Sequence, residues 1–379
     1  MKKIALIGST GSIGRQVLNV VRRYSDKFEI VSISAGTNAR AFLEQVKEFN
    51  PQVATLASGY EDIKSELPAG VQYSFGENSF KDAIIPSADI VVVSLVGYKG
   101  VIAVLDAVEK GKDIALANKE SLVVGGELVT RLAKEKGVRI TPIDSEHSAI
   151  WQALNFDYNT PFEKIILTAS GGAFRDYTKE MLKTATAKDA LRHPNWAMGA
   201  KITVDCATLV NKGFEVIEAK WLYNAPFDKI DVIIHRESII HSMVEFKDRG
   251  VIAQLSYPSM ELPIQLALNY PERMDAGLKS LDFATLKTLT FETPDTDRFP
   301  CLKLVVDAGK KGGLYPAVVN GANDTAVDLF LKGRIGYGDI YASLNGALDA
   351  FKGGSVDGLC SLEDANAFAT RFVKDKFGV

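Results

Sequence analysis

Apolar and polar positions alternate in a regular way over the first third of the chain. Runs of apolar residues, typical of buried parallel strands, lie at 4–7, 29–36, 88–97 and 112–118. Stretches with the apolar spacing of helices separate these runs, as at 17–21. This alternation of strands and helices predicts a doubly wound α/β sheet.

The hydrophobic pattern changes after residue 144. The runs at 229–236, 238–246 and 251–258 predict a second, partly antiparallel sheet. From about residue 299 the apolar spacing is helical, as in 323–333 and 339–351. We therefore expect an N-terminal α/β domain, a central α/β domain with a mixed sheet, a linker and a C-terminal helical bundle. Their expected boundaries are 1–144, 145–270, 271–298 and 299–379.

The composition narrows the class of protein. The chain has 379 residues, enough for two or three domains. Its net charge of -3, without a long basic run, argues against nucleic acid as a partner. No apolar run reaches the roughly 18–20 residues that span a bilayer, which argues against a membrane. Widely separated cysteines (Cys206, Cys301, Cys360) and a start at Met1 that leads straight into a strand predict a soluble, cytoplasmic protein.

Glycines follow the first apolar run and precede the first helical pattern. Gly8, Gly11 and Gly14 allow a tight turn and a close approach of the backbone to a pyrophosphate at the helix N-terminus. A glycine-rich turn without a ligand is the alternative. The end of the second run, 34–40, has no acid to hold a ribose 2′-hydroxyl, and Arg40 suits a 2′-phosphate, so the pattern favours NADPH over NADH.

Two acids follow an apolar run in the middle of the chain. Asp144 and Glu146 are two residues apart, which places both carboxylates on one face if the strand continues. Carboxylates held together repel unless a cation bridges them, and oxygen ligands suit Mg²⁺ or Mn²⁺. The alternative is a solvated loop with a helix N-cap at Ser145 or Ser148.

Further polar segments follow the acids. The strand-like run that ends at 170–172 suits an anion, and 192–201 suits a loop that closes over a ligand, or a packed surface loop. The segment 201–223 is expected to run from a strand into a helix. Lys212 near the helix start suggests a bound anion. Spacing alone does not decide which of the two glutamates on this helix, Glu215 or Glu218, is functional.

In their order, these segments resemble the 1-deoxy-D-xylulose 5-phosphate reductoisomerase family, and the resemblance extends over the whole chain. The segments that carry it read GSTGSIG, LANKESLV, IDSEH, SGGAFR, RHPNWAMG and NKGFEVIEA. The resemblance implies a homodimer with a Rossmann-like NADPH domain and a central catalytic domain. It also implies an activity that depends on NADPH and on Mn²⁺ or Mg²⁺: rearrangement and reduction of 1-deoxy-D-xylulose 5-phosphate to 2-C-methyl-D-erythritol 4-phosphate, the first committed step of non-mevalonate isoprenoid synthesis.

The resemblance also implies residue roles. The coenzyme set is Thr10, Gly11, Ser12, Ile13, Gly36, Thr37, Asn38, Asn118, Glu120 and Gly199. The metal ligands are Asp144, Glu146 and Glu215, which selects Glu215 over Glu218. The substrate set is Lys119, Ser145, Glu146, Ser170, His193, Trp196, Cys206, Asn211, Lys212 and Glu215, with Met198 in the closing loop and His241 nearby. The catalytic set is Lys119, Asp144, Glu146, Glu215 and His193.

Two other functions are compatible with part of the pattern. One is an NADPH-dependent reductase of another phosphorylated aldehyde, but hydride transfer alone does not require three carboxylates. The other is a coenzyme-sensing regulatory protein without chemistry, which would tolerate the loss of Asp144, Glu146 and Glu215, yet all three acids are present.

One position departs from the family pattern. Cys206 stands where the family usually has a serine that helps to hold the substrate phosphate. Because a thiol is a weaker hydrogen-bond donor than a hydroxyl, we predict that the phosphate clamp depends more on Ser170, Asn211 and Lys212, or on the Cys206 backbone. The KM of a Cys206→Ser variant checks this. An unchanged KM would mean that the side chain at this position is not an important part of the clamp.

Overall fold

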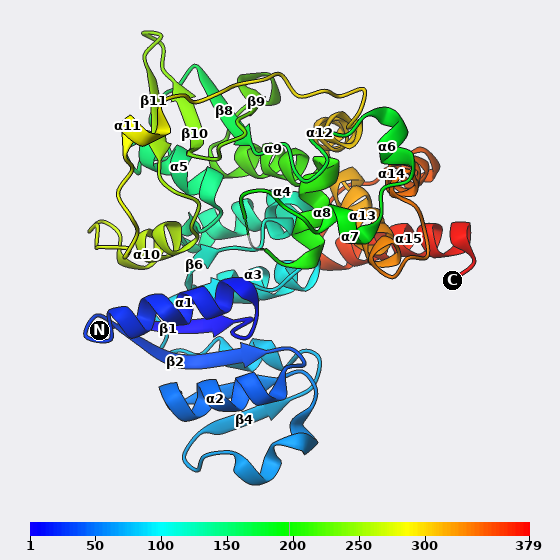
Figure 1. Cartoon of the computed structure of the whole chain (residues 1–379). Coiled ribbons are helices and arrows are strands. Elements are labelled where there is room, and N and C mark those ends of the chain that lie inside the picture. The colour runs from blue at the N-terminus through cyan, green and yellow to red at the C-terminus, as the bar shows by residue number, and fades with distance from the viewer. Residues whose placement is uncertain (197) are drawn as a thin grey trace. The chain divides into compact units, whose positions relative to one another are not determined.

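The computed structural model describes residues 1–196 and 198–379 (Figure 1). The chain forms two compact units. The first contains Met1–Asn118, Val129–Ser148 and Ser259–Leu278, and the second contains Lys119–Leu128, Ala149–Pro258 and Lys279–Val379. Among the described residues, no helix is both long and apolar enough to cross a bilayer. The expected boundaries at 144, 270 and 298 stay a prediction.

The first unit is built on a parallel sheet, as the alternating pattern predicts. Within the described residues it has seven strands in the order β4-β3-β2-β1-β5-β6-β7. Their bounds are β1 (Lys2–Ile7), β2 (Phe28–Ala35), β3 (Val53–Leu56), β4 (Gln72–Phe75), β5 (Ile90–Val93), β6 (Asp113–Leu116) and β7 (Ile140–Pro142). The sequence pattern did not indicate β3 and β4, because both have four residues and those of β4 are only partly buried or exposed.

Helices cover this sheet. They are α1 (Ser12–Arg23), α2 (Ala39–Phe49), α3 (Lys99–Glu109) and α10 (Glu261–Asn269), with short 3-10 turns at Tyr60–Asp62, Lys64–Glu66 and Ser79–Ala83. Val17 and Leu18 of α1 and Ile264 and Leu268 of α10 join the apolar core of the sheet. The Leu268 carbonyl also accepts a hydrogen bond from the Lys2 ammonium at 2.7 Å. Helix α10 therefore completes the apolar core of the parallel sheet, although it is more than 100 residues after β7 in the sequence.

The second unit has the predicted mixed sheet. Among the described residues its strands lie in the order β11-β10-β8-β9. β10 is antiparallel to β8 and to β11, and β8 is parallel to β9. Their bounds are β8 (Lys164–Ala169), β9 (Ile230–Ile234), β10 (Ile240–Glu245) and β11 (Val251–Leu255). The short helices α6 (Lys179–Lys183), α7 (Ala187–Ala190) and α11 (Phe283–Leu286) and a 3-10 turn at Phe227–Lys229 connect these elements.

The expectation of a strand over the start of 201–223 is wrong. The segment forms α8 (Ala200–Thr208) and α9 (Val210–Leu222), separated by Leu209 with a φ of 61°. The β-branched run at 202–204 favours a strand locally, but Thr203, Val204, Ala207 and Thr208 bury one helical face. Burial of that face therefore overrides the local preference.

The C-terminal region is helical, as predicted. It contains α12 (Cys301–Lys311), α13 (Tyr315–Leu331), α14 (Tyr337–Ala350) and α15 (Leu359–Phe377). Glycines let α12 approach α9 closely: a Cβ on Gly213 would lie 2.7 Å from the Val305 Cβ, and one on Gly309 would lie 2.7 Å from Ile217 Cγ1. This close packing fixes the position of α9, which carries Lys212 and Glu215.

Two further helices carry site residues. They are α4 (Glu120–Lys136), which bends at Gly125, and α5 (Ser145–Ala153). The bend is a departure from helical geometry, with Gly125 at φ -119° and ψ 17°. Close packing occurs at the next residue as well, since a Cβ on Gly126 would lie 2.2 Å from the Trp221 ring. The start of α4 is thereby held against α9.

Candidate active site

The glycine turn between β1 and α1 forms a cradle of backbone amides. Gly8 has a φ of 95°, and a Cβ on Gly14 would lie 2.2 Å from the Gly8 carbonyl oxygen, so glycine is required at both positions. Within the described residues no side chain caps α1 at Gly11 and no acid lies in its first turn. The amides at the start of α1, where Thr10, Ser12 and Ile13 lie, therefore suit an anion.

The end of β2 presents the next part of the predicted coenzyme set. Gly36 has open space around it, and Asn38 caps α2 by accepting a hydrogen bond from the Ala41 amide at 3.2 Å. Arg40 forms an ion pair with Glu66, which lowers the pKa of the Glu66 carboxyl. Its side chain is 64% exposed, so the guanidinium remains accessible at this end of the sheet.

Asn118 organises the loops at the ends of β5 and β6. Its amide donates to the carbonyl oxygens of Leu95 at 2.8 Å and Gly97 at 3.3 Å. A Cβ on Gly100 would lie 2.0 Å from the Asn118 side chain, which again requires glycine. The carboxyl ends of parallel strands are where open α/β sheets bind ligands, and Asn118 shapes this edge.

Asp144 and Glu146 do not lie on an extended strand end, so that part of the prediction is wrong. Strand β7 ends at Pro142, and α5 begins at Ser145. The Asp144 carboxylate accepts a hydrogen bond from the Glu146 amide at 3.2 Å, and the Asp144 carbonyl accepts from the Ser148 amide at 2.8 Å. Asp144 thus caps helix α5. Its hydrogen bonds to the first amides of the helix compete with continuation of the strand, and the chain therefore turns into a helix at this point.

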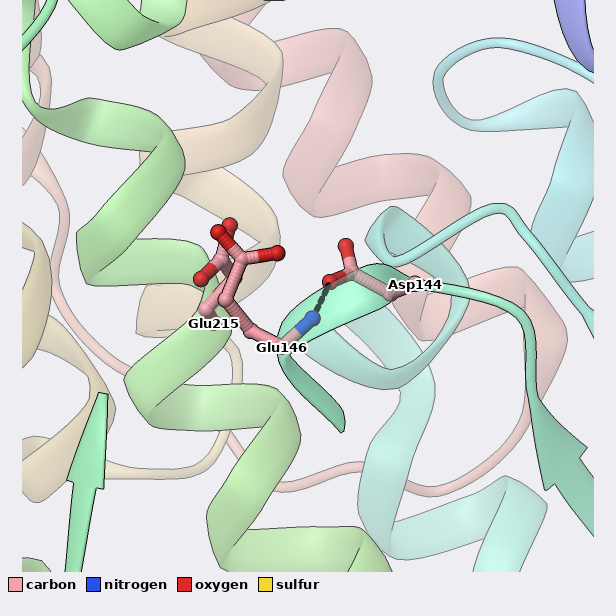
Figure 2. Close-up of side chains that lie close together, drawn as sticks. All are labelled: Asp144, Glu146 and Glu215. Atoms are coloured by element: carbon pink, nitrogen blue, oxygen red, sulfur yellow. Dashed lines mark hydrogen bonds between the residues drawn. The ribbon is translucent and has the colours of Figure 1, made fainter. Parts of the chain in front are cut away.

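The two acids and Glu215 nevertheless come together. One carboxylate oxygen from each of Asp144, Glu146 and Glu215 lies within 4.8 Å of the others. Figure 2 shows the three side chains pointing toward one another, Glu215 from α9 and Glu146 from the first turn of α5. Ser145 donates to the Glu146 carboxylate at 2.5 Å and orients it. Three clustered carboxylates repel one another unless cations offset their charge, and an oxygen-only donor set fits a hard divalent cation.

Glu215 is the most enclosed of these acids, with no exposed surface. Its Oε1 accepts from the Asn211 amide at 2.6 Å and from the Lys119 ammonium at 3.0 Å. Its Oε2 accepts from the Lys212 ammonium. The structure therefore brings together four residues of the predicted metal and substrate sets, and it selects Glu215 over Glu218 for the acid cluster.

Ser170 and His193 form a second polar group. His193 Nδ1 accepts hydrogen bonds from the Asn195 amide at 3.2 Å and the Trp196 amide at 3.0 Å. Its Nε2 therefore carries the proton and donates to Ser170 Oγ at 2.9 Å. Ser170 Oγ also accepts from the Gly172 amide at 3.2 Å. With these two donors directed at its oxygen, the Ser170 hydroxyl hydrogen can point to a bound anion.

The loop that contains Ser170 packs closely on α8. Gly172 has a φ of 70°, and a Cβ there would lie 2.3 Å from the Cys206 carbonyl oxygen. Cys206 is partly exposed as a residue, but burial of its thiol raises the pKa well above the usual value despite the nearby Lys119 charge. The thiol is therefore neutral at physiological pH and acts as a weak donor at most.

Trp196, Met198 and Gly199 of the predicted sets lie in the segment 191–199. Ala197 of this segment is outside the described residues. The Trp196 ring packs edge-on against His241, with ring centroids 6.0 Å apart. His241 Nε2 is 2.9 Å from Ser256 Oγ. Gly199 precedes α8, and its carbonyl accepts from the Thr203 hydroxyl at 2.8 Å. Met198 is partly exposed. The roles of these residues toward substrate and coenzyme stay predictions.

Glu120, whose coenzyme contact stays a prediction, is held by a lysine of α8. Its carboxylate accepts from the Lys201 ammonium at 2.8 Å. Sequence reasoning gave no role to Lys201, although its spacing of four residues from Asp205 on one helix was a signal that the two side chains meet.

A doubly wound sheet with an uncapped glycine turn, together with an oxygen-only acid cluster, is typical of dinucleotide-dependent enzymes that also hold a divalent cation. Comparisons with known proteins make this class specific. A family model described as 1-deoxy-D-xylulose 5-phosphate reductoisomerase matches residues 4–126. Two models for C-terminal domains of the same enzyme match residues 140–223 and 255–371.

Full-length relatives and solved structures agree. The chain is 48% identical over 378 residues to the 1-deoxy-D-xylulose 5-phosphate reductoisomerase of Geobacillus sp., with 99% of both chains covered. It is 47% identical over 380 residues to that of Chloroherpeton thalassium, with 99% of this chain and 98% of the relative covered. The chain belongs to the 1-deoxy-D-xylulose 5-phosphate reductoisomerase family.

Two solved structures carry ligands that are relevant here. The enzyme from Zymomonas mobilis in complex with NADPH superposes with a TM-score of 0.92 at 36% identity, covering 99% of both chains. A DOX-P reductoisomerase in complex with NADPH, fosmidomycin and magnesium superposes with a TM-score of 0.94 at 34% identity, covering 100% of this chain and 98% of the other. The predicted fold class is confirmed.

The environment of His193 gives a testable pH behaviour. Burial, and then the Arg175 charge, lower the pKa of His193 to about 4. We expect its NMR signals to titrate near pH 4, whereas an unperturbed histidine titrates near 6.5. The folded pKa is depressed, so the unfolded chain binds more protons between about pH 4 and 6.5, and the His193 contribution lowers stability as pH falls through this window. A midpoint near 6.5 would contradict the effect of burial and of the Arg175 charge on the His193 pKa.

Proposed function

We propose that the protein converts 1-deoxy-D-xylulose 5-phosphate to 2-C-methyl-D-erythritol 4-phosphate, with NADPH as reductant and Mg²⁺ or Mn²⁺ as cofactor. The observation that carries this proposal is the approach of the Asp144, Glu146 and Glu215 carboxylates to within 4.8 Å of one another. Family membership supports the substrate, and the solved complexes of relatives with NADPH and with magnesium support the cofactors.

The metal and the coenzyme would have distinct sites. Asp144, Glu146 and Glu215 would hold the cation, which when bound supplies Lewis acidity toward the carbonyl and hydroxyl oxygens of the ketose. The amides at the start of α1 would hold the coenzyme pyrophosphate, and the turn 36–38 and the accessible Arg40 would hold its adenosine end. NADPH held there would supply the hydride for reduction of an aldehyde.

Residues of α9 and the loop after β8 would bind the substrate phosphate. Lys212 and Asn211 lie in the first turn of α9, where the helix dipole also favours an anion. The Ser170 hydroxyl is oriented by His193 and by the Gly172 amide. Because His193 is neutral at physiological pH, it serves as a hydrogen-bond donor to Ser170 and adds no charge to the phosphate site.

Lys119 would act on the reacting oxygens. Its ammonium lies 3.0 Å from a Glu215 carboxylate oxygen, and its side chain is 8% exposed. A positive charge held in a dry site stabilises negative charge that develops on a neighbouring oxygen far better than a solvated charge does. The segment 192–201, which contains Trp196 and is here called the closing segment, would cover the substrate and exclude water from the intermediate aldehyde.

The first test is NADPH oxidation by the purified protein with 1-deoxy-D-xylulose 5-phosphate and Mn²⁺. We expect oxidation to require both, and chelation of the metal to abolish it. A Glu215→Gln variant should lose more than about 100-fold in kcat/KM, because charge stabilisation worth several kcal/mol is removed.

The matched control for this loss is Glu61→Gln. Glu61 is 74% exposed and pairs with Lys64 at the surface, so its loss should leave kcat/KM unchanged. Thermal unfolding of both variants verifies that Glu215→Gln is folded at the assay temperature. Oxidation that survives chelation would move the acids to a structural role. NADPH binding without turnover on this substrate would instead favour the coenzyme-sensing alternative.

We also propose that the protein is a homodimer that works in the cytoplasm. The widely separated cysteines support a reducing compartment, which cell fractionation tests. The support for dimerisation is β11, the edge strand of the second sheet, where Val251 and Ile252 are each 51% exposed. Exposed apolar edge strands are pairing surfaces.

Sedimentation velocity measures the oligomeric state. The wild-type protein is expected to sediment as a dimer, and Ile252→Lys is expected to shift it toward the monomer because a charge would be buried at the interface. Met181→Lys is the control, since Met181 is 47% exposed on α6, outside this strand. A dimer that is unaffected by Ile252→Lys would place the interface elsewhere.

A further inference from the structure

Lys201 is the centre of a compact ion cluster in the second unit. Its ammonium lies 2.8 Å from Glu120 Oε1, 3.0 Å from Asp205 Oδ2 and 3.0 Å from Asp324 Oδ1. Asp205 also accepts from the Asn323 amide at 2.8 Å. The Lys201 side chain is 18% exposed. We name Lys201, Glu120, Asp205 and Asp324 the Lys201 cluster.

Several residues in contact with Lys201 are next to proposed site residues along the chain. The Lys201 ammonium also lies 5.5 Å from the centre of the buried Phe214 ring. Three of the partners are immediate chain neighbours of residues in the proposed site: Glu120 follows Lys119, Asp205 precedes Cys206, and Phe214 precedes Glu215. Lys201 itself stands two residues after Gly199, at the end of the closing segment. The Lys201 ammonium therefore lies close to the side chains of three residues, each of which is adjacent in sequence to a residue of the proposed site.

Asp324 has a different origin from the other members. It lies on α13, in the C-terminal helical bundle, beside Asn323. Its second carboxylate oxygen accepts from the Asn320 amide at 3.2 Å. Asp324 and Asn323 thus connect the bundle, which contributes no residue to the proposed metal, coenzyme or substrate sets, to the elements that do.

The cluster has an excess of negative charge. Three carboxylates face one ammonium, so burial and the neighbouring acids Glu120 and Asp205, opposed by Lys201, leave the pKa of Asp324 at about 6. Burial would lower the pKa of Lys201, but Asp205, Asp324 and Glu120 together raise it well above the usual value. Burial would raise the pKa of Glu120, but Lys201 holds it below the usual value. Lys201 therefore stays charged, and Asp324 takes up a proton below about pH 6.

We infer that Lys201 is a positioning residue: through Asp324 it fastens α4, α8 and α9 to the C-terminal bundle and so sets the placement of Lys119, Cys206 and Glu215. This inference rests on the proposed function, since it assigns those three residues to catalysis and substrate binding. Groups that orient metal ligands directly contribute roughly 10–100-fold to activity or metal affinity, and we expect the lower end of this range because Lys201 contacts Phe214, the neighbour of Glu215.

The test is an Asp324→Asn variant, which keeps the shape of the side chain but removes its charge. We expect kcat to fall about tenfold, with the melting temperature nearly unchanged. Asp328→Asn is the matched control, because Asp328 lies one turn further along α13 and pairs with Lys332 at the surface, with 57% and 63% exposure. Asp324→Glu, which keeps the charge, should recover most of the loss.

A pH profile separates positioning from a merely structural role. Below about pH 6 the wild-type Asp324 is protonated and resembles the asparagine variant. The ratio of wild-type to Asp324→Asn kcat should therefore be about tenfold at pH 8 and approach one near pH 5, while the ratio to Asp328→Asn stays near one throughout. A ratio independent of pH, or a kcat loss that follows only the unfolded fraction, would overturn the inference.

Mn²⁺ affinity supplies a measurement without turnover. Electron paramagnetic resonance titration of the free Mn²⁺ signal should show several-fold weaker binding for Asp324→Asn than for Asp328→Asn, because Glu215 follows Phe214 on α9. If the wild-type protein binds Mn²⁺ but does not oxidise NADPH with 1-deoxy-D-xylulose 5-phosphate, the proposed function fails. The Mn²⁺ difference between the two variants still decides the inference: equal affinities overturn it.

Discussion

The structure depends on the compensation of charges that are withdrawn from water. Glu215 has no exposed surface, yet it accepts from two ammonium groups and one amide. Removing one partner from such a group leaves an unpaired buried charge that costs about 3–5 kcal/mol. Their hydrogen bonds to Glu215 therefore hold the Lys119, Asn211 and Lys212 side chains in the positions from which they would contact the substrate. Stability and function use the same contacts here.

Close backbone packing makes this charge arrangement possible. Gly213 and Gly309 let α9 and α12 pack so closely that a Cβ at either position would clash with the other helix. Gly172 likewise lets the loop after β8 pack closely on α8. Side chains at these positions would push the helices apart and displace α9, which carries Glu215. Glycines in this chain therefore serve two purposes, since those after β1 open a site for a ligand and those in the second unit hold the site together.

The C-terminal helical bundle contributes both packing and charge to the elements that carry the proposed site. Its apolar faces pack α12 on α9, and its polar residues Asn323 and Asp324 extend into the Lys201 cluster. A buried ion cluster is weak evidence for stability but a good device for fixing one arrangement of helices. The residues that we propose as catalytic and the bundle are thus coupled through geometry as well as through the covalent chain.

The sequence by itself determined the doubly wound sheet, the mixed second sheet, the helical C-terminal region and the glycine turn, because these follow from hydrophobic period and local backbone preference. It also indicated Asp144, Glu146 and Lys212 as chemical residues. It predicted a strand at the start of 201–223, and it left Glu215 and Glu218 equivalent except by resemblance. Only the tertiary structure decided these points, because burial of a helical face overrides local preference and because partners such as Lys119 and Glu215, 96 residues apart, meet through packing that no local pattern encodes.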